Sequence, residues 1–229
     1  MVTYVYSANW FHGIESVFDI IYIVVALLIT YFSYKGYKYI PKKNYLYFAF
    51  SFFLIAASFF IKMLSDITIY SRGLAEKSVE VDVVKSYVIQ RIDWVYNIQF
   101  YGFIFARFLV LLAFLMLLVV ALKIRDKKII GLLVYLMVVT ALYSEFSFVA
   151  FHITLALMLL FLAAHYWKSY KKQKKGNSKF VFMAFFAIFL SQVVFSFVEL
   201  SQSVYVVGAV LQLIGYLLLF YTIVLVLKK

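Results

Sequence analysis

The chain of 229 residues is 66% hydrophobic and only 14% charged, and its mean hydropathy is +0.99. Soluble domains carry about 25% charged residues, so this composition indicates an integral membrane protein and excludes a sizeable soluble catalytic domain. Cysteine is absent, which excludes disulfides, cysteine metal sites and thiol nucleophiles. The net charge of +12 is distributed as membrane orientation requires, so we expect no nucleic-acid partner.

Seven apolar runs, each bounded by charged or turn residues, predict helices of about the length that a bilayer requires. They cover residues 17–34, 45–64, 98–122, 129–144, 148–167, 180–200 and 204–227, and the fourth is short. No Lys or Arg and no cleavage site precede the first run, so we expect this helix to be retained and not removed as a signal peptide. The predicted fold is all-α: one polytopic membrane domain, residues 1–229, with seven transmembrane helices.

Lysine and arginine gather in every second connection. Of the 22 basic residues, 16 follow the first, third or fifth predicted helix or end the chain. The positive-inside rule assigns these connections to the cytoplasm, which predicts an external amino terminus and a cytoplasmic carboxyl terminus. Of the ten acidic residues only Asp126 falls on the cytoplasmic side. We therefore expect a multi-pass protein of the cell membrane.

The one long connection, residues 65–97, is predicted as an outer loop that contains an amphipathic helix. Its apolar residues recur at three- and four-residue steps, as a helix with one apolar side requires. This stripe comprises Val81, Val84, Val88, Ile92 and Val95. The alternation of polar and apolar residues over 78–83 leaves a short strand as an alternative. In either form the apolar side is expected to cover the bundle.

Six of the seven predicted helices carry a strongly polar residue at a similar depth, in the outer third of the bilayer, when counted at about 1.5 Å per residue. These residues are Asp19, Lys62, Arg107, His152, Gln192 and Gln212, and Glu199 lies at the outer end of the sixth helix. Because intramembrane ionisable residues usually face the bundle interior or a wet cavity, we predict an intramembrane polar layer that binds a ligand. Snorkelling toward the headgroups and simple packing of the helices are the two alternatives.

Charges in such a layer require partners, because one charge at the centre of a membrane helix costs roughly 2.5–3.5 kcal/mol. The sequence offers pairs of Arg107 with Asp19 or Glu199, and of Lys62 with Asp19 or Asp66. Both a packing role and a ligand-binding role are compatible with these pairs.

Specific chemistry is poorly supported by the sequence. His12, His152 and His165 form no close ligand motif, so no metal site is expected. An acid/base pair of His152 with Asp19 or Glu199 lacks a positioned nucleophile, and no glycine loop that would bind phosphate is present. We therefore predict no catalytic residue and no cofactor, and an enzyme is the least favoured class.

Two segments carry a resemblance to known proteins: "SYKGYKYIPKKNYLYFAFSFFLIAASF", residues 33–59, and "VGAVLQLIGYLLLFYTIVLVLKK", residues 207–229. In hydropathy and basic loops they are similar to uncharacterised archaeal seven-helix membrane proteins and to the amino-terminal seven-helix sensor regions of some histidine kinases. The lysine-, isoleucine- and tyrosine-rich composition without cysteine is also typical of an archaeon. A retinal protein is not expected, because residues 204–227 contain no lysine.

These observations predict a membrane protein of sensor or binding type with an outward-facing intramembrane polar pocket for an unknown small ligand. A small transporter or channel is one alternative, and a membrane-embedded accessory subunit of a larger complex is another. The expected partners are the lipid bilayer and another membrane or signalling protein. A signalling output would come from such a partner, because the printed chain has only two residues after its last predicted helix.

Overall fold

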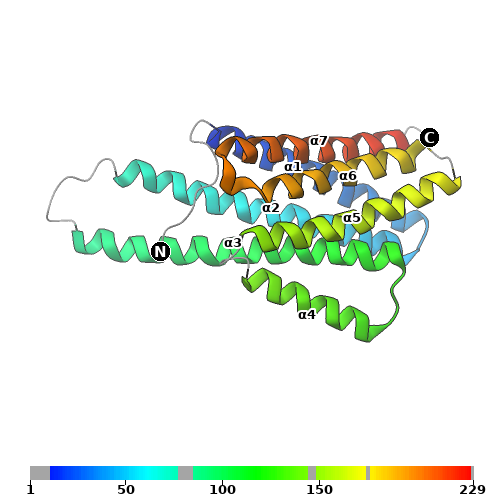
Figure 1. Ribbon diagram of the computed structural model, residues 1–229, viewed down its shortest axis with the longest axis horizontal. Helices are drawn as coiled ribbons and strands as arrows, with labels where there is room; N and C mark the ends of the chain where they lie inside the picture. The colour runs from blue at the N-terminus through cyan, green and yellow to red at the C-terminus, as the bar shows by residue number, and fades with distance from the viewer. Residues whose placement is uncertain (1–10, 77–84, 144–147, 174–175, 228–229) are drawn as a thin grey trace.

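The computed structural model describes residues 11–76, 85–143, 148–173 and 176–227, and these residues form an all-helical bundle. The helices are α1 His12–Tyr39, α2 Lys43–Glu76, α3 Lys85–Leu122, α4 Lys127–Tyr143, α5 Phe148–Gln173, α6 Gly176–Phe195, the short 3₁₀ helix η1 Val198–Leu200, and α7 Gln202–Leu227. Successive helices run antiparallel, so the basic turns gather at one end of the bundle, where α7 also finishes (Figure 1). We call this end the basic end.

Six of the described helices are long and apolar enough to cross a membrane. The candidate spans are Ile14–Tyr39, Lys43–Asp66, Phe100–Leu122, Phe148–Lys172, Asn177–Phe195 and Ser203–Leu225. The prediction of an all-α fold is confirmed, and the six apolar helices indicate a multi-pass membrane protein. Helix α4 has 17 residues, about 25 Å of helix, which is shorter than a hydrocarbon core of about 30 Å.

Local sequence explains where the helices stop. Ile40 adopts an extended conformation after α1, with φ −129° and ψ 98°, because the ring of Pro41 disfavours the helical conformation in the residue before it. Helix α6 ends at Phe195, short of the predicted boundary at 200, where the chain tightens into η1. Ser201 then caps α7, with its hydroxyl oxygen accepting a hydrogen bond from the backbone N–H of Ser203 at 3.3 Å.

The connection predicted over 65–97 has a different form. Helix α2 continues to Glu76 and α3 begins at Lys85, so most of this segment lies in the ends of two long helices. The sequence from Lys85 into the third span contains neither Gly nor Pro before Gly102, and therefore no strong stop signal. The strand alternative over 78–83 and the side chains of the apolar stripe lie outside the described residues.

Helices α6 and α7 approach each other closely because glycine faces their interface. A Cβ atom at Gly208 of α7 would come within 2.8 Å of the Phe195 ring, and one at Gly215 would come within 3.1 Å of the backbone oxygen of Ala184. Small residues allow membrane helices to pack backbone against backbone in this way. The hairpin therefore forms one tightly packed side of the bundle.

Helix α4 lies at the edge of the bundle, on the far side of α3 from α7 (Figure 1). Its buried residues are Met137 and Ala141, both in its second half. No residue of its first half, 127–136, is buried. Figure 1 shows the same asymmetry, since the first half of α4 diverges from α3 and the second half returns toward it.

Candidate functional site

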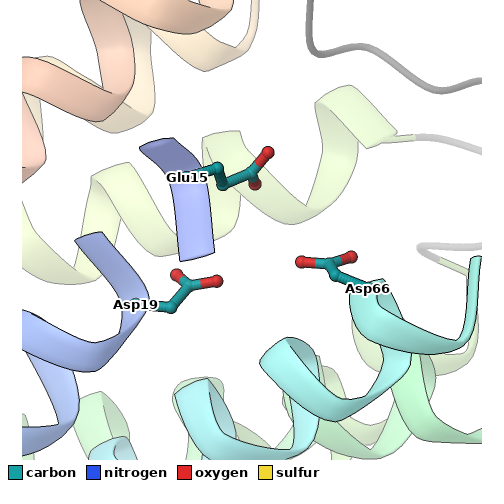
Figure 2. A group of neighbouring side chains, drawn as sticks. All are labelled: Glu15, Asp19 and Asp66. Atoms are coloured by element: carbon teal, nitrogen blue, oxygen red, sulfur yellow. The ribbon is translucent and has the colours of Figure 1, made fainter. Parts of the chain in front are cut away.

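Four charged side chains from α1 and α2 meet at the end of the bundle opposite the basic end. The ammonium nitrogen of Lys62 lies 2.8 Å from Glu15 Oε1, 2.8 Å from Asp19 Oδ2 and 3.0 Å from Asp66 Oδ2. Glu15 and Asp19 share a face of α1 because they are four residues apart, and Lys62 and Asp66 share a face of α2 for the same reason. Figure 2 shows the three carboxylates around a common centre. We call these four residues the Lys62 cluster.

The Lys62 cluster is rich in carboxylates, and its side chains differ in exposure. Three carboxylates face one ammonium, and one oxygen of each carboxylate lies within 4.8 Å of those of the other two. Side-chain exposure rises from 3% for Asp19 through 11% for Glu15 and 15% for Asp66 to 25% for Lys62. Asp19 is therefore the most buried side chain of the cluster and Lys62 the most exposed.

Two tyrosines tie α7 to the Lys62 cluster. The hydroxyl of Tyr205 donates a hydrogen bond to Glu15 Oε1. The hydroxyl of Tyr22, on α1, donates in the opposite direction to the backbone oxygen of Ala209 at 3.0 Å. The Tyr22 ring also packs against Phe59 and Tyr216, with centroids 4.8 and 4.9 Å away. These three rings form an aromatic floor that closes the cluster toward the basic end.

A second polar group joins α5 to α6. His152 Nδ1 lies 2.7 Å from Gln192 Oε1, and both residues are buried. An amide oxygen only accepts hydrogen bonds, so this contact places the imidazole proton on Nδ1. Gln192 Nε2 donates to Ser191 Oγ at 3.2 Å, and Ser191 Oγ donates to the backbone oxygen of Ile188 at 2.7 Å. We call His152, Gln192 and Ser191 the His152 cluster.

Aromatic rings surround the His152 cluster and connect it with the first one. The imidazole of His152 lies 4.2 Å from the Phe148 ring, 4.9 Å from the Phe151 ring and 5.1 Å from the Phe195 ring, measured between centroids. The guanidinium of Arg107 lies over Phe148 and Phe151, 5.5 and 5.4 Å from their centroids, a geometry that favours a cation–π contact.

Phe195 provides the link between the two clusters. Its ring lies 5.3 Å from the ring of Tyr205, measured between centroids, and Tyr205 bonds Glu15. The two clusters are therefore connected by packed aromatic rings of α6 and α7.

The structure divides the seven predicted site residues among several environments. The pairing of Lys62 with Asp19 or Asp66 is confirmed, and both pairs are present. His152 and Gln192 contact each other, and Arg107 lies beside them against aromatic rings. Glu199 is exposed in η1 and Gln212 is half-buried on α7; neither is a member of either cluster.

Sequence reasoning missed Glu15 and Ser191, which belong to the two clusters, and Tyr205, which bonds Glu15. Glu15 lies four residues before Asp19 on the same helix face, and this spacing alone could have paired it with Lys62. Tyr205 gave no such signal, because it bonds a residue 190 positions away. Helical spacing reveals neighbours within one helix, whereas contacts between distant helices require the fold.

Comparisons with protein families, curated proteins and solved structures give no match. The resemblance to archaeal seven-helix proteins and kinase sensor regions stays a prediction. What the chain does is therefore inferred from the chemistry of its two clusters.

Proposed function

We propose that this protein is a membrane protein of sensor or binding type that receives a small cationic ligand at the Lys62 cluster, from the outer face of the membrane. The observation that carries the proposal is the meeting of three carboxylates with one lysine, whose side chain is 25% exposed. Ionisable residues inside a membrane usually face the bundle interior or a wet cavity and mark ligand or ion sites. A cation that reaches the cluster would compete with Lys62 for the carboxylate oxygens.

Lys62 acts in this proposal as a tethered competitor of the ligand. Its ammonium contacts an oxygen of each of the three carboxylates, which is the position that a free cation would take. A bound cation would release Lys62 from at least one carboxylate. The contacts between α1 and α2 would then change, and the Tyr205–Glu15 hydrogen bond would transmit the change to α7.

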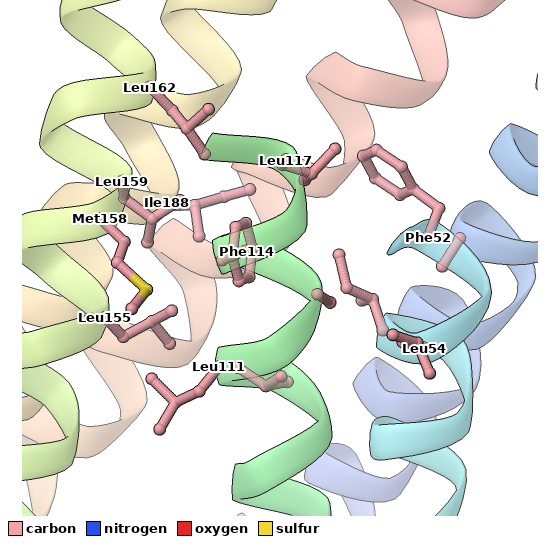
Figure 3. Packing of buried hydrophobic residues seen from close by; sticks show 14 of the residues in the cluster. Phe52, Leu54, Leu111, Phe114, Leu117, Leu155, Met158, Leu159, Leu162 and Ile188 are labelled. Carbon is pink, nitrogen blue, oxygen red and sulfur yellow. The ribbon is translucent and has the colours of Figure 1, made fainter. Parts of the chain in front are cut away.

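The apolar packing toward the basic end favours binding over conduction. Figure 3 shows α3 between α5 and α2, and Leu111, Phe114 and Leu117 belong to the same buried hydrophobic cluster as residues of both neighbours. The aromatic floor lies directly below the Lys62 cluster. Of the described residues in this half of the bundle, the buried polar ones are Ser51 and Thr222, whose hydroxyls bond backbone oxygens of their own helices. The described residues therefore favour a site that is closed toward the basic end. A transporter would have to move helices to open a path there.

The membrane topology is the second part of the proposal. We infer that the basic end is cytoplasmic and that α4 is a seventh span. Helices α3 and α5 run in the same direction (Figure 1), so the chain must return between them, and α4 is the segment that does so. Its length of about 25 Å is compatible with a local thinning of the bilayer.

Ligand-dependent stability tests the binding proposal. The purified full chain in detergent would be unfolded thermally in NaCl, LiCl, CaCl₂ and tetramethylammonium chloride, each at constant ionic strength balanced with the bulky cation N-methylglucamine. One of these cations should stabilise the protein saturably, by about 2.7 kcal/mol at 100 times its Kd. Asp66→Asn should abolish the response while leaving the more buried Asp19 paired with Lys62.

Glu199→Gln is the matched control, because it removes the same charge at the same end of the bundle from an exposed position. It should respond to the cation as the parent does. A parent that no cation stabilises, or an Asp66→Asn variant with the parent's response, would assign the Lys62 cluster a structural role only. Uptake of the stabilising cation into proteoliposomes would replace the sensor with a transporter.

Topology is tested with single cysteines, since the parent has none. In intact cells an impermeant thiol reagent should label Lys77→Cys and Glu145→Cys but not Arg125→Cys or Gln173→Cys. Opposite labelling at 77 and 173 would reverse the orientation. Identical labelling at 125 and 145 would show that α4 does not cross.

A further inference from the structure

We propose that the turn between α3 and α4, together with the exposed first half of α4, binds an anionic phospholipid, with its phosphate at the turn and an acyl chain along α4. This site lies at the basic end, opposite the Lys62 cluster, and it does not depend on the proposed function.

The turn has a fixed backbone. Lys123 ends α3 in the left-handed region, with φ 56°, and the N–H groups of Lys123 and Ile124 bond back to Val120 and Val119 at 3.3 and 3.1 Å. This is the bonding pattern of a helix end that usually employs glycine. Asp126 then begins the next helix, since its Oδ1 accepts a hydrogen bond from the N–H of Lys128 at 2.8 Å. Both ends of the turn are therefore held by hydrogen bonds.

This fixed turn presents a dense group of cations. Its basic residues are Lys123, Arg125, Lys127 and Lys128, and all four are exposed. The single acidic residue among them, Asp126, caps α4 with its carboxylate. Such a group attracts anionic headgroups at about 1 kcal/mol per basic residue.

The first half of α4 offers an apolar surface next to these cations. No residue of 127–136 is buried, and the side chains of Leu132 and Leu136 are 59% and 50% exposed. A Cβ atom added at Gly131 would meet nothing within 4 Å, so the protein leaves this side of α4 uncovered near the turn.

Charge decides which occupant fits this surface. A second copy of the chain would bring the same four cations to the contact and be repelled. A lipid with a phosphate and a net negative charge neutralises the turn, and its acyl chain covers the apolar residues one to three helical turns further along α4. A zwitterionic lipid supplies the chain without the net charge.

Lipid binding by native mass spectrometry tests the proposal, with the purified full chain, phosphatidylglycerol and phosphatidylcholine. The parent should retain phosphatidylglycerol in preference. Each basic residue contributes about a fivefold factor, so the triple variant Arg125→Gln/Lys127→Gln/Lys128→Gln should bind phosphatidylglycerol roughly 100-fold more weakly. The matched control is Lys35→Gln/Lys42→Gln/Lys43→Gln, which removes three exposed charges from the other described basic turn and should bind as the parent does.

Two further measurements separate the lipid from its headgroup. Gly131→Leu places a side chain where the acyl chain is proposed and should weaken phosphatidylglycerol binding several-fold without changing the charge. Glycerol 3-phosphate, the headgroup phosphate without chains, should not displace the lipid at millimolar concentration. Equal losses in the two triple variants, full displacement by glycerol 3-phosphate, or unchanged binding in Gly131→Leu would each overturn the proposal.

Discussion

Both polar clusters satisfy buried polar side chains inside an apolar bundle, but with different chemistry. The Lys62 cluster balances charge with charge, through three carboxylate–ammonium contacts of 2.8 to 3.0 Å between α1 and α2. The His152 cluster contains neutral hydrogen-bonding groups between α5 and α6, and it is enclosed by phenylalanine rings. The first is built from charged groups and the second from uncharged ones.

This difference indicates which cluster is able to respond to a ligand. Neutral groups that satisfy one another have little reason to exchange partners, and both His152 and Gln192 are buried. Three carboxylates that share one ammonium can exchange it for another cation, and the Lys62 side chain is 25% exposed. The binding role that we propose therefore suits the Lys62 cluster, and a packing role suits the His152 cluster.

Removal of Lys62 should have the largest effect. Lys62→Met would leave three carboxylates together without their cation, and breaking a buried ion pair in this way costs about 3–5 kcal/mol. The free energy of unfolding in mixed micelles measures the loss. Lys43→Met, at the exposed start of the same helix, is the control and should change it by less than about 0.5 kcal/mol.

Neutralising the partners should rescue that variant. Lys62→Met combined with Glu15→Gln, Asp19→Asn and Asp66→Asn should recover most of the lost stability, because an ion cluster replaced as a whole is often neutral in cost. A quadruple variant as unstable as Lys62→Met would mean that the loss in Lys62→Met does not come from carboxylates left without a cation.

The His152 cluster should show a smaller loss. Gln192→Leu removes the partner of His152 Nδ1 and should cost about 2 kcal/mol, the penalty for one unsatisfied buried polar group. The double variant His152→Leu/Gln192→Leu should be more stable than Gln192→Leu alone, since no polar group then lacks a partner. Equal stability of the single and double variants would remove this contrast between the clusters.

The contact between the clusters should contribute somewhat less than the His152 cluster. Tyr205→Phe keeps the ring that packs on Phe195 and deletes the hydroxyl that bonds Glu15. A hydrogen bond to a charged group contributes about 1.5–3 kcal/mol, and we expect a loss at the lower end because Glu15 keeps Lys62. The Tyr22→Phe variant, unfolded in parallel, deletes the hydrogen bond to the neutral backbone oxygen of Ala209. It should lose less stability, about 1 kcal/mol.

Sequence patterns predicted the helical class and part of the site. The physical content of each pattern explains why the rest of the site was not predicted. Hydropathy identified the apolar helices because lipid demands long apolar runs. Depth counted along the helices brought Asp19 to the level of Lys62, and the two do pair. Depth specifies no direction around a helix axis, so it grouped Gln212 with residues that it does not join. The position of α4 at the edge of the bundle was equally unreadable, because a helix exposed to lipid and a helix buried in protein are both apolar.

Arg107 is a cation inside a predicted span, and two aromatic rings are among its neighbours. We expect a coupling free energy of about 1 kcal/mol between Arg107→Leu and Phe151→Leu in a double-mutant cycle, the magnitude of a cation–π contact that is partly desolvated. The cycle is needed because Arg107→Leu alone also removes a charge from an apolar environment, which changes stability in the opposite direction. Arg107→Lys retains the charge but not the planar group that stacks on rings, so it should lose most of the coupling. A coupling of zero with Phe151 would show that other groups stabilise the guanidinium. Arg107 would then play no part in packing the aromatic rings around the His152 cluster.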